Sequence, residues 1–145
     1  MVKREESVKL LKECDAGTQM GISSLEQVID DISNRELRSI LEDSRSRHQE
    51  IKSEIDQYLN EYGEEGKEPA MMATVMAKMK ENMKMMTERE ECAAANVIID
   101  GCNMGIKSIY KYFNQYPNAE ERVKGLVNDI VEEEEALCCK LRCYL

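Results

Sequence analysis

Three side chains in this sequence have the types and positions for a buried polar site or a metal site. His48, the only histidine of the chain, falls in a run of mostly apolar positions spaced four and three residues apart. Glu134 takes the matching position in a similar run near the C-terminus, and Asp15 lies on an apolar face near the N-terminus. Because all three fall on apolar helix faces, we expect Asp15, His48 and Glu134 to lie together in the interior, on three different helices. Imidazole and carboxylate groups bind divalent metal ions.

No set of residues in the sequence is typical of an enzyme. A Ser/His/Asp or Cys/His arrangement needs a histidine beside a nucleophile, and His48 already belongs to an apolar seam. The acidic run at residues 132–135 is expected to lie mostly on a solvated helix face, so it is not assigned acid or base chemistry. No catalytic residue is predicted.

Long amphipathic helices must position these side chains. Apolar residues recur every three or four positions over residues 4–32, 34–62, 88–115 and 119–144, which is the spacing of one helix face. A shorter helix is expected over residues 70–86. The chain has only two prolines and seven glycines, and no alternating Val, Ile and Thr runs. It is therefore predicted to be all-α.

Helix starts are marked by three capping patterns, in which a short polar residue precedes a Glu by three positions. The pairs are Ser33 with Glu36, Thr87 with Glu90, and Asn118 with Glu121. They predict starts near residues 34, 88 and 119.

One short segment occurs twice. Residues 17–25 read GTQMGISSL and residues 101–109 read GCNMGIKSI, with Gly, Met, Gly, Ile and Ser at matching positions. Two similar halves are expected, with the two segments on adjacent helices. The glycines at positions 17, 21, 101 and 105 would let these helix backbones approach closely. A glycine-lined ligand slot is the alternative interpretation.

The long crossover between the second and third long helices allows them to run parallel, which gives two antiparallel hairpins as in ferritin-like bundles. The segments LLKECDAGTQMGISSLEQV (10–28), NEYGEEGKEP (60–69) and DGCNMGIKSIYKYFNQY (100–116) resemble an uncharacterised bacterial family of four-helix-bundle proteins in the ferritin-like group. The resemblance covers most of the chain. Together with the length of 145 residues, it implies one ferritin-like domain over residues 1–145.

A ferritin-like bundle implies a di-metal carboxylate centre, which takes a Glu from each of two helices and Glu-x-x-His from each of the others. Asp15, His48 and Glu134 match part of that set. Apolar residues stand where other ligands belong, at Ile51, Ile99 and Leu137. We expect a degenerate site, either a polar network or a weakly bound iron or manganese ion with Cys102 nearby, and no other cofactor.

Composition restricts the class of function. The formal net charge is −9, with 42% hydrophobic residues, which argues against nucleic-acid binding and against disorder. No apolar run is long enough to span a membrane, and the charged N-terminus predicts no signal peptide. Six cysteines are then expected as thiols in the cytoplasm. We predict a non-catalytic structural or interaction module; the alternative is a metal-dependent redox or metal-handling protein.

Methionines concentrate in residues 70–86. A stripe on one face is formed by Met72, Met76, Met79, Met83 and Met86. It is expected to pack on the bundle or on a second subunit, which predicts a homodimer; a plastic partner-binding surface is the alternative. Three cysteines also crowd the C-terminus, at Cys138, Cys139 and Cys143. The last two share a helix face, which suits either ordinary packing or metal binding and cross-linking.

Overall fold

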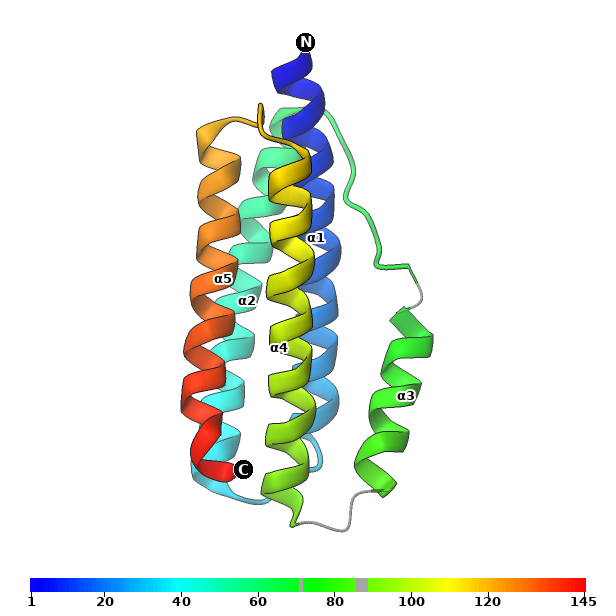
Figure 1. The fold of residues 1–145 in the computed structure, drawn as a ribbon, viewed down its shortest axis with the longest axis vertical. Helices are drawn as coiled ribbons and strands as arrows, with labels where there is room; N and C mark the ends of the chain where they lie inside the picture. Colours follow the sequence, from blue (N-terminus) through cyan, green and yellow to red (C-terminus); the bar gives the residue numbers. More distant parts are fainter. Residues whose placement is uncertain (71, 86–88) are drawn as a thin grey trace.

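The computed structural model describes residues 1–70, 72–85 and 89–145. These residues form helices and no strand (Figure 1). The elements are α1 (Val2–Ile29), α2 (Arg35–Glu61), α3 (Met72–Met85), α4 (Glu90–Gln115), α5 (Glu121–Leu141) and a short 3-10 helix, η1 (Arg142–Tyr144). The all-α prediction is confirmed, and the helix ends lie within a few residues of those predicted.

Four long helices stand side by side, and α3 lies outside them (Figure 1). α1 packs against α2 and α4, and α5 packs against the same two helices from the other side. Each hairpin is antiparallel. The chain returns along the outside of the bundle through α3, so α2 and α4 run in the same direction. The two similar segments lie on α1 and α4, each the first helix of its hairpin, and these two helices are in contact.

The bundle interior contains two apolar clusters separated by a polar layer. The upper cluster includes Leu10, Leu11, Ile51, Ile55, Val123 and Val127. The lower cluster includes Leu25, Val28, Leu37, Leu41, Ile98 and Leu137. Between them along the helices lie the buried polar residues Asp15, Thr18, Ser44 and His48. Each fully buried aliphatic side chain contributes about 1.5–3 kcal/mol, so the two clusters hold the polar layer in place.

The α2 seam follows the predicted alternation of four and three residues as far as Ile55, after which Leu59 is buried and Tyr58 is only half-buried. Its buried residues are Leu37, Leu41, Ser44, His48, Ile51, Ile55 and Leu59. The alternation of four and three residues places them on one face because it is close to the helical repeat. The same face therefore carries apolar residues at both ends and polar ones in the middle.

Two of the predicted caps are wrong. α2 is capped by Asn34, whose Oδ1 accepts the Leu37 N–H at 2.9 Å, while Ser33 instead binds the carboxylate of Glu90. The N-cap of α5 is Glu120 rather than Asn118. There the Glu120 N–H is bound by Ser7 Oγ of α1 at 2.8 Å, so a remote side chain replaces a local cap. The third predicted cap, Thr87, and Met86 of the Met stripe lie outside the described residues.

The Asn34 cap makes a testable difference to stability. Asn34→Ala removes the acceptor for the Leu37 N–H, and loss of such a cap costs about 1 kcal/mol. We expect a lower unfolding free energy of that size in urea titrations. Asn60→Ala, an exposed change in the last turn of α2, should be close to neutral. Equal effects of the two substitutions would contradict this assignment of the cap.

Candidate functional site

His48 and Glu134 form a buried pair at the centre of the bundle. His48 Nε2 of α2 lies 2.6 Å from Glu134 Oε1 of α5, and the side chains are 3% and 12% exposed. The other ring nitrogen, Nδ1, lies 2.7 Å from the Ser44 carbonyl oxygen. A carbonyl only accepts, so Nδ1 carries a proton, and the short contact at Nε2 is a charge-assisted bond to a carboxylate.

The surroundings of His48 favour its protonated form. Burial alone lowers the pKa of the imidazole, because it disfavours the charged form. The hydrogen bond and negative charge of Glu134, the Ser44 carbonyl and the charge of Glu133 outweigh burial, and the net pKa is raised above the ordinary 6.5. The pair is therefore best described as an imidazolium with a carboxylate.

Glu133 adds a contact that the sequence did not predict. Ser44 Oγ donates to Glu133 Oε2 at 2.8 Å, so two neighbouring glutamates of α5 turn towards α2. Glu132 and Glu135 are exposed, as expected for a solvated face, whereas Glu133 is partly buried and Glu134 mostly buried. The feature of the sequence that could have indicated this contact is Ser44, a polar residue on the mostly apolar face of α2.

Asp15 lies in a separate cluster. It is fully buried, and Lys52 Nζ lies 2.7 Å from its Oδ1. Its Oδ2 accepts hydrogen bonds from Gln19 Nε2 at 2.8 Å and from the Lys67 N–H at 2.9 Å. Lys52 stands one helical turn beyond His48 on α2, and no hydrogen bond or ion pair joins Asp15 to His48. Of the three predicted residues, the structure pairs His48 with Glu134 and gives Asp15 other partners.

The Asp15 cluster holds the start of the crossover against α1. Gln19 also donates to the Lys67 carbonyl oxygen at 3.1 Å, so both backbone groups of Lys67 are bound, and Glu13 pairs with the Lys67 ammonium. A Cβ on Gly66 would lie 2.2 Å from Asp15 Oδ2, a distance that only glycine avoids. We call Glu13, Asp15 and Gln19 the α1 clamp.

The residues present do not fit a di-metal centre. Both ring nitrogens of His48 already have partners, and both Asp15 oxygens have close donors. Within residues 1–70, 72–85 and 89–145, no group of three or more His, Cys, Asp or Glu side chains is arranged to hold a metal ion. Ile51 and Leu137 are buried apolar residues at positions where ligands were sought. The geometry therefore describes a polar network.

Cys102 is buried beside this network. Burial raises the pKa of its thiol, and the neighbouring Glu134 carboxylate and Cys138 thiol act in the same direction. A thiol with a raised pKa is a poor nucleophile and a poor metal ligand, because both roles require the thiolate. Cys139 and Cys143, by contrast, are exposed.

The repeated glycines have a different role from the one predicted. A Cβ on Gly21 would lie 3.0 Å from His48 Cδ2, and one on Gly105 would lie 3.9 Å from Glu134 Oε2. Nothing lies within 4 Å of a Cβ on Gly17 or Gly101. The expected close approach of two backbones at all four glycines is wrong. Gly21 instead leaves room for the His48 ring, which fills the space proposed for a ligand slot.

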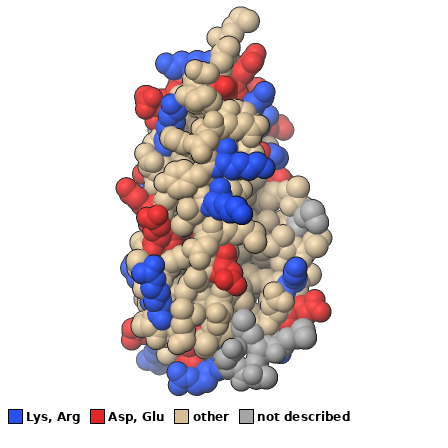
Figure 2. All heavy atoms as spheres, in the orientation of Figure 1, with Lys and Arg blue, Asp and Glu red and all other residues tan. Residues whose placement is uncertain are grey.

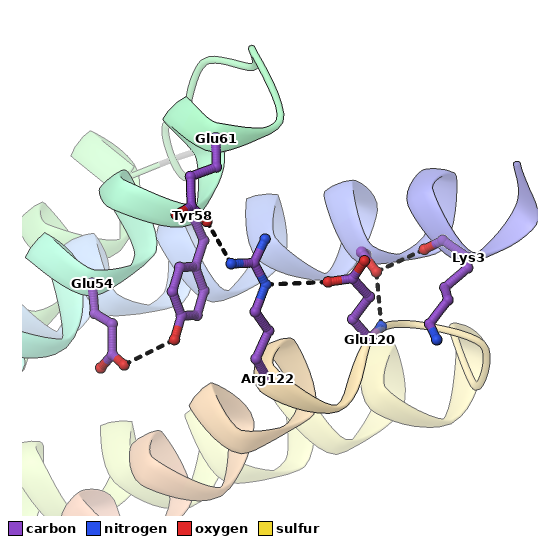
Figure 3. Close-up of polar contacts among 7 residues, drawn as sticks. Lys3, Glu54, Tyr58, Glu61, Glu120 and Arg122 are labelled. Atoms are coloured by element: carbon purple, nitrogen blue, oxygen red, sulfur yellow. Dashed lines mark hydrogen bonds and ion pairs between the residues drawn. The ribbon is translucent and has the colours of Figure 1, made fainter.

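A further polar cluster joins α2 and α5 at the end of the bundle where α5 begins (Figure 3). Arg122 of α5 pairs with Glu61 of α2 and with Glu120. Its guanidinium also lies over the rings of Tyr58 and Tyr62, at 4.5 and 5.3 Å from their centroids. Because the charge of Arg122 is balanced by two carboxylates, this cluster is a structural junction.

The surface supplies no basic patch on the face shown in Figure 2, where Lys and Arg alternate with Asp and Glu between broad uncharged areas. An open depression of about 670 Å³ lies at the end of the bundle, lined by residues 1–3 and by parts of 117–124. None of the polar-layer residues lines it. No described helix is both long and apolar enough to cross a membrane.

Comparison with known proteins gives no match to a protein family, a curated protein or a solved structure. The resemblance to ferritin-like bundles therefore stays a prediction. The chemistry of the polar layer has to be inferred from its geometry alone.

The His48–Glu134 pair predicts an unusual titration. Since His48 is the only histidine, its ring-proton NMR signals can be followed against pH without ambiguity. We expect a midpoint above 6.5, because Glu134 raises the pKa. The stabilisation by this pair should be complete below 6.5 and disappear as pH rises through the folded-state pKa.

Glu134→Gln is the matched control for that titration. It keeps the shape of the side chain but removes its charge, so burial should dominate and lower the His48 midpoint below 6.5. Glu132→Gln, at an exposed neighbouring position, should leave the midpoint near that of the parent. A parent midpoint at or below 6.5 would show that the pair is not ionic.

The glycines give a second prediction for this layer. Gly17→Ala and Gly101→Ala should stabilise by about 1 kcal/mol each, because alanine is the better helix former and its Cβ meets nothing. Gly21→Ala should instead destabilise by about 1–3 kcal/mol, because the His48 ring must move. Urea unfolding measures all three. Stabilisation by Gly21→Ala would refute the assigned role of that glycine.

Proposed function

We propose that this chain is a ferritin-like helical bundle acting as a non-catalytic structural or interaction module with a degenerate metal site. The observation that carries the proposal is the His48–Glu134 pair. Its ring nitrogens and carboxylate are bonded to one another and to Ser44. A catalytic or metal centre needs groups that are free to bind a substrate or an ion.

The topology supports the ferritin-like part of the proposal. Two antiparallel hairpins are connected by one long crossover, and the helices on either side of it run parallel. Ferritin-like bundles have this connection, whereas simple up-and-down bundles have only short loops. The matching segments on α1 and α4 agree with two similar halves.

The polar layer has a structural use that needs no substrate. A buried charge without a partner costs several kcal/mol, so a sliding movement of α2 along α5 would separate His48 from Glu134 at high cost. Apolar side chains alone tolerate such shifts more easily. We infer that the pair fixes the axial register of the two hairpins.

A metal-handling or redox role is the alternative function. The neighbours of Glu134 favour it, because His48 and Cys102 each lie beside this carboxylate and all three groups are metal ligands when deprotonated. An iron or manganese ion at this position would have to replace the His48–Glu134 hydrogen bond and ionise a thiol whose pKa is raised. We therefore favour the structural role.

The proposed setting is the cytoplasm, because six free cysteines are compatible with a reducing compartment. No nucleic-acid or membrane partner is proposed for this acidic chain. A homodimer stays a prediction. Its original basis was an uncovered Met stripe, but Met79 and Met83 pack against the lower cluster of their own chain.

Metal analysis tests the proposed function. Protein purified from medium supplemented with iron and manganese should carry no stoichiometric metal, and a chelator should leave its melting temperature unchanged. Two metal atoms per chain, or a chelator effect that disappears in His48→Leu, would establish the metal-handling alternative.

A single and a double variant test the register role, with the free energy of unfolding as the measurement. His48→Leu alone should destabilise by about 3 kcal/mol, because it leaves Glu134 buried without its partner. The double variant His48→Leu/Glu134→Leu should recover most of that loss, because it removes both charges. Failure of the second substitution to restore stability would contradict the role assigned to the pair.

A further inference from the structure

α3 is held less firmly than any long helix of the bundle. Every side chain described from Met72 to Lys84 is at least partly exposed, whereas each of the other α-helices has several buried residues. Its polar contacts with α1 are long. Ser23 and Ser24 donate to the sulfurs of Met72 and Met76 at 3.7 and 4.0 Å, and Gln27 donates to the Met76 carbonyl at 3.4 Å.

α3 rests on α1 and α4, which also contact each other, and we call the surface that these two helices present to α3 the groove. Met79 and Met83 reach from α3 to the lower cluster, beside Ile99 of α4. The contact is not closed, because an open pocket of about 190 Å³ remains between Gln27 and Asp31 of α1 and the Lys80–Lys84 turn of α3. The groove therefore accommodates its helix with imperfect packing.

The α1 clamp anchors the crossover to α1 just before α3 begins. Both backbone groups of Lys67 are bound by Asp15 and Gln19, so the chain is fixed just before α3. A movement of α3 would leave this attachment in place and would uncover the part of the lower cluster that Met79 and Met83 contact. Few buried contacts and a fixed neighbouring anchor are the features of a segment that opens locally.

We propose that α3 is a displaceable lid on a helix-binding groove of α1 and α4, and that the groove accepts an amphipathic helix from a partner protein. This inference rests on the interaction role proposed above. α3 itself defines the chemistry of that partner. It presents methionines to the groove, at Met72, Met76, Met79 and Met83, and it directs Lys78, Lys80 and Lys84 towards solvent.

A methionine stripe suits a contact that must be both made and released. The unbranched thioether side chain adapts to irregular surfaces, and grooves that bind helices read apolar residues three and four positions apart. Ser23, Ser24 and Gln27 supply polar groups at the edge of the groove. A partner helix with Met or Leu at this spacing would replace α3 without changing the bundle.

Hydrogen exchange on the parent protein tests the lid. Amides of α3 should exchange at least about tenfold faster than those in the middle of α1 and α4, because α3 opens without global unfolding. The double variant Met79→Ala/Met83→Ala should accelerate α3 further, because it removes the contacts of α3 with the lower cluster. Equal protection of α3, α1 and α4 would overturn the proposal.

Binding of a synthetic peptide with the α3 sequence tests the groove. Met79→Asp places a charge against the lower cluster and should release α3, and Thr74→Asp is the control on its exposed face. Fluorescence anisotropy should show the labelled peptide binding Met79→Asp at least about tenfold more tightly than the parent or the control, because the groove is no longer occupied. A peptide with serine in place of its methionines should not bind.

The possible outcomes separate the proposals. Fast exchange of α3 in Met79→Asp without peptide binding would overturn the groove. Concentration-dependent dimerisation of Met79→Asp in sedimentation, without peptide binding, would assign the groove to a second copy of the chain and overturn the partner claim. If Met79→Asp fails to fold, the same titration on Met79→Ala/Met83→Ala decides. None of these results alters the metal analysis, so the non-catalytic role is judged independently.

Discussion

The ion pair between His48 and Glu134 is the constraint on which the rest of the bundle depends. Two charged groups in an apolar interior are tolerated only at hydrogen-bonding distance, and this fixes α2 relative to α5. The ring also has to fit beside α1, which requires Gly21 there, and its second nitrogen needs the Ser44 carbonyl. The apolar clusters above and below leave the two side chains only 3% and 12% exposed to water. One interaction thus specifies the side chains on three helices and the register between them.

A second buried carboxylate follows the same rule with a different result. Asp15 is neutralised by Lys52 of α2, but its other oxygen faces outward to the backbone of Lys67. It therefore links the core to the crossover, while Glu134 links two core helices. In both cases an acid is buried only where a cation from α2 meets it. The remaining acidic residues are mostly at the surface, which is consistent with the net charge of −9.

The interior of the bundle is closed by these pairs, and α3 on its surface is bound differently. Of the three residues predicted to form an interior site, His48 and Glu134 bind each other and Asp15 binds Lys52 and the Lys67 N–H. α3 is the opposite case, because most of its described side chains are exposed, none is fully buried, and its contacts with α1 are long. A rigid bundle with one weakly attached helix is suited to recognition, since the rigid part provides a preformed groove and the weak part can be exchanged.

The sequence by itself determined the class of the fold, the positions of the four long helices and the interior placement of His48. These follow from local periodicity, because the helical repeat decides which residues share a face. It did not determine which polar residues meet. Asp15 was expected beside His48. It pairs instead with Lys52, which follows His48 by one turn of α2. The cap of α5 comes from Ser7 of α1, and Gly21 serves a histidine ring rather than a helix backbone. Such contacts depend on the rotation and axial offset of helices packed together, and only the tertiary structure decides these.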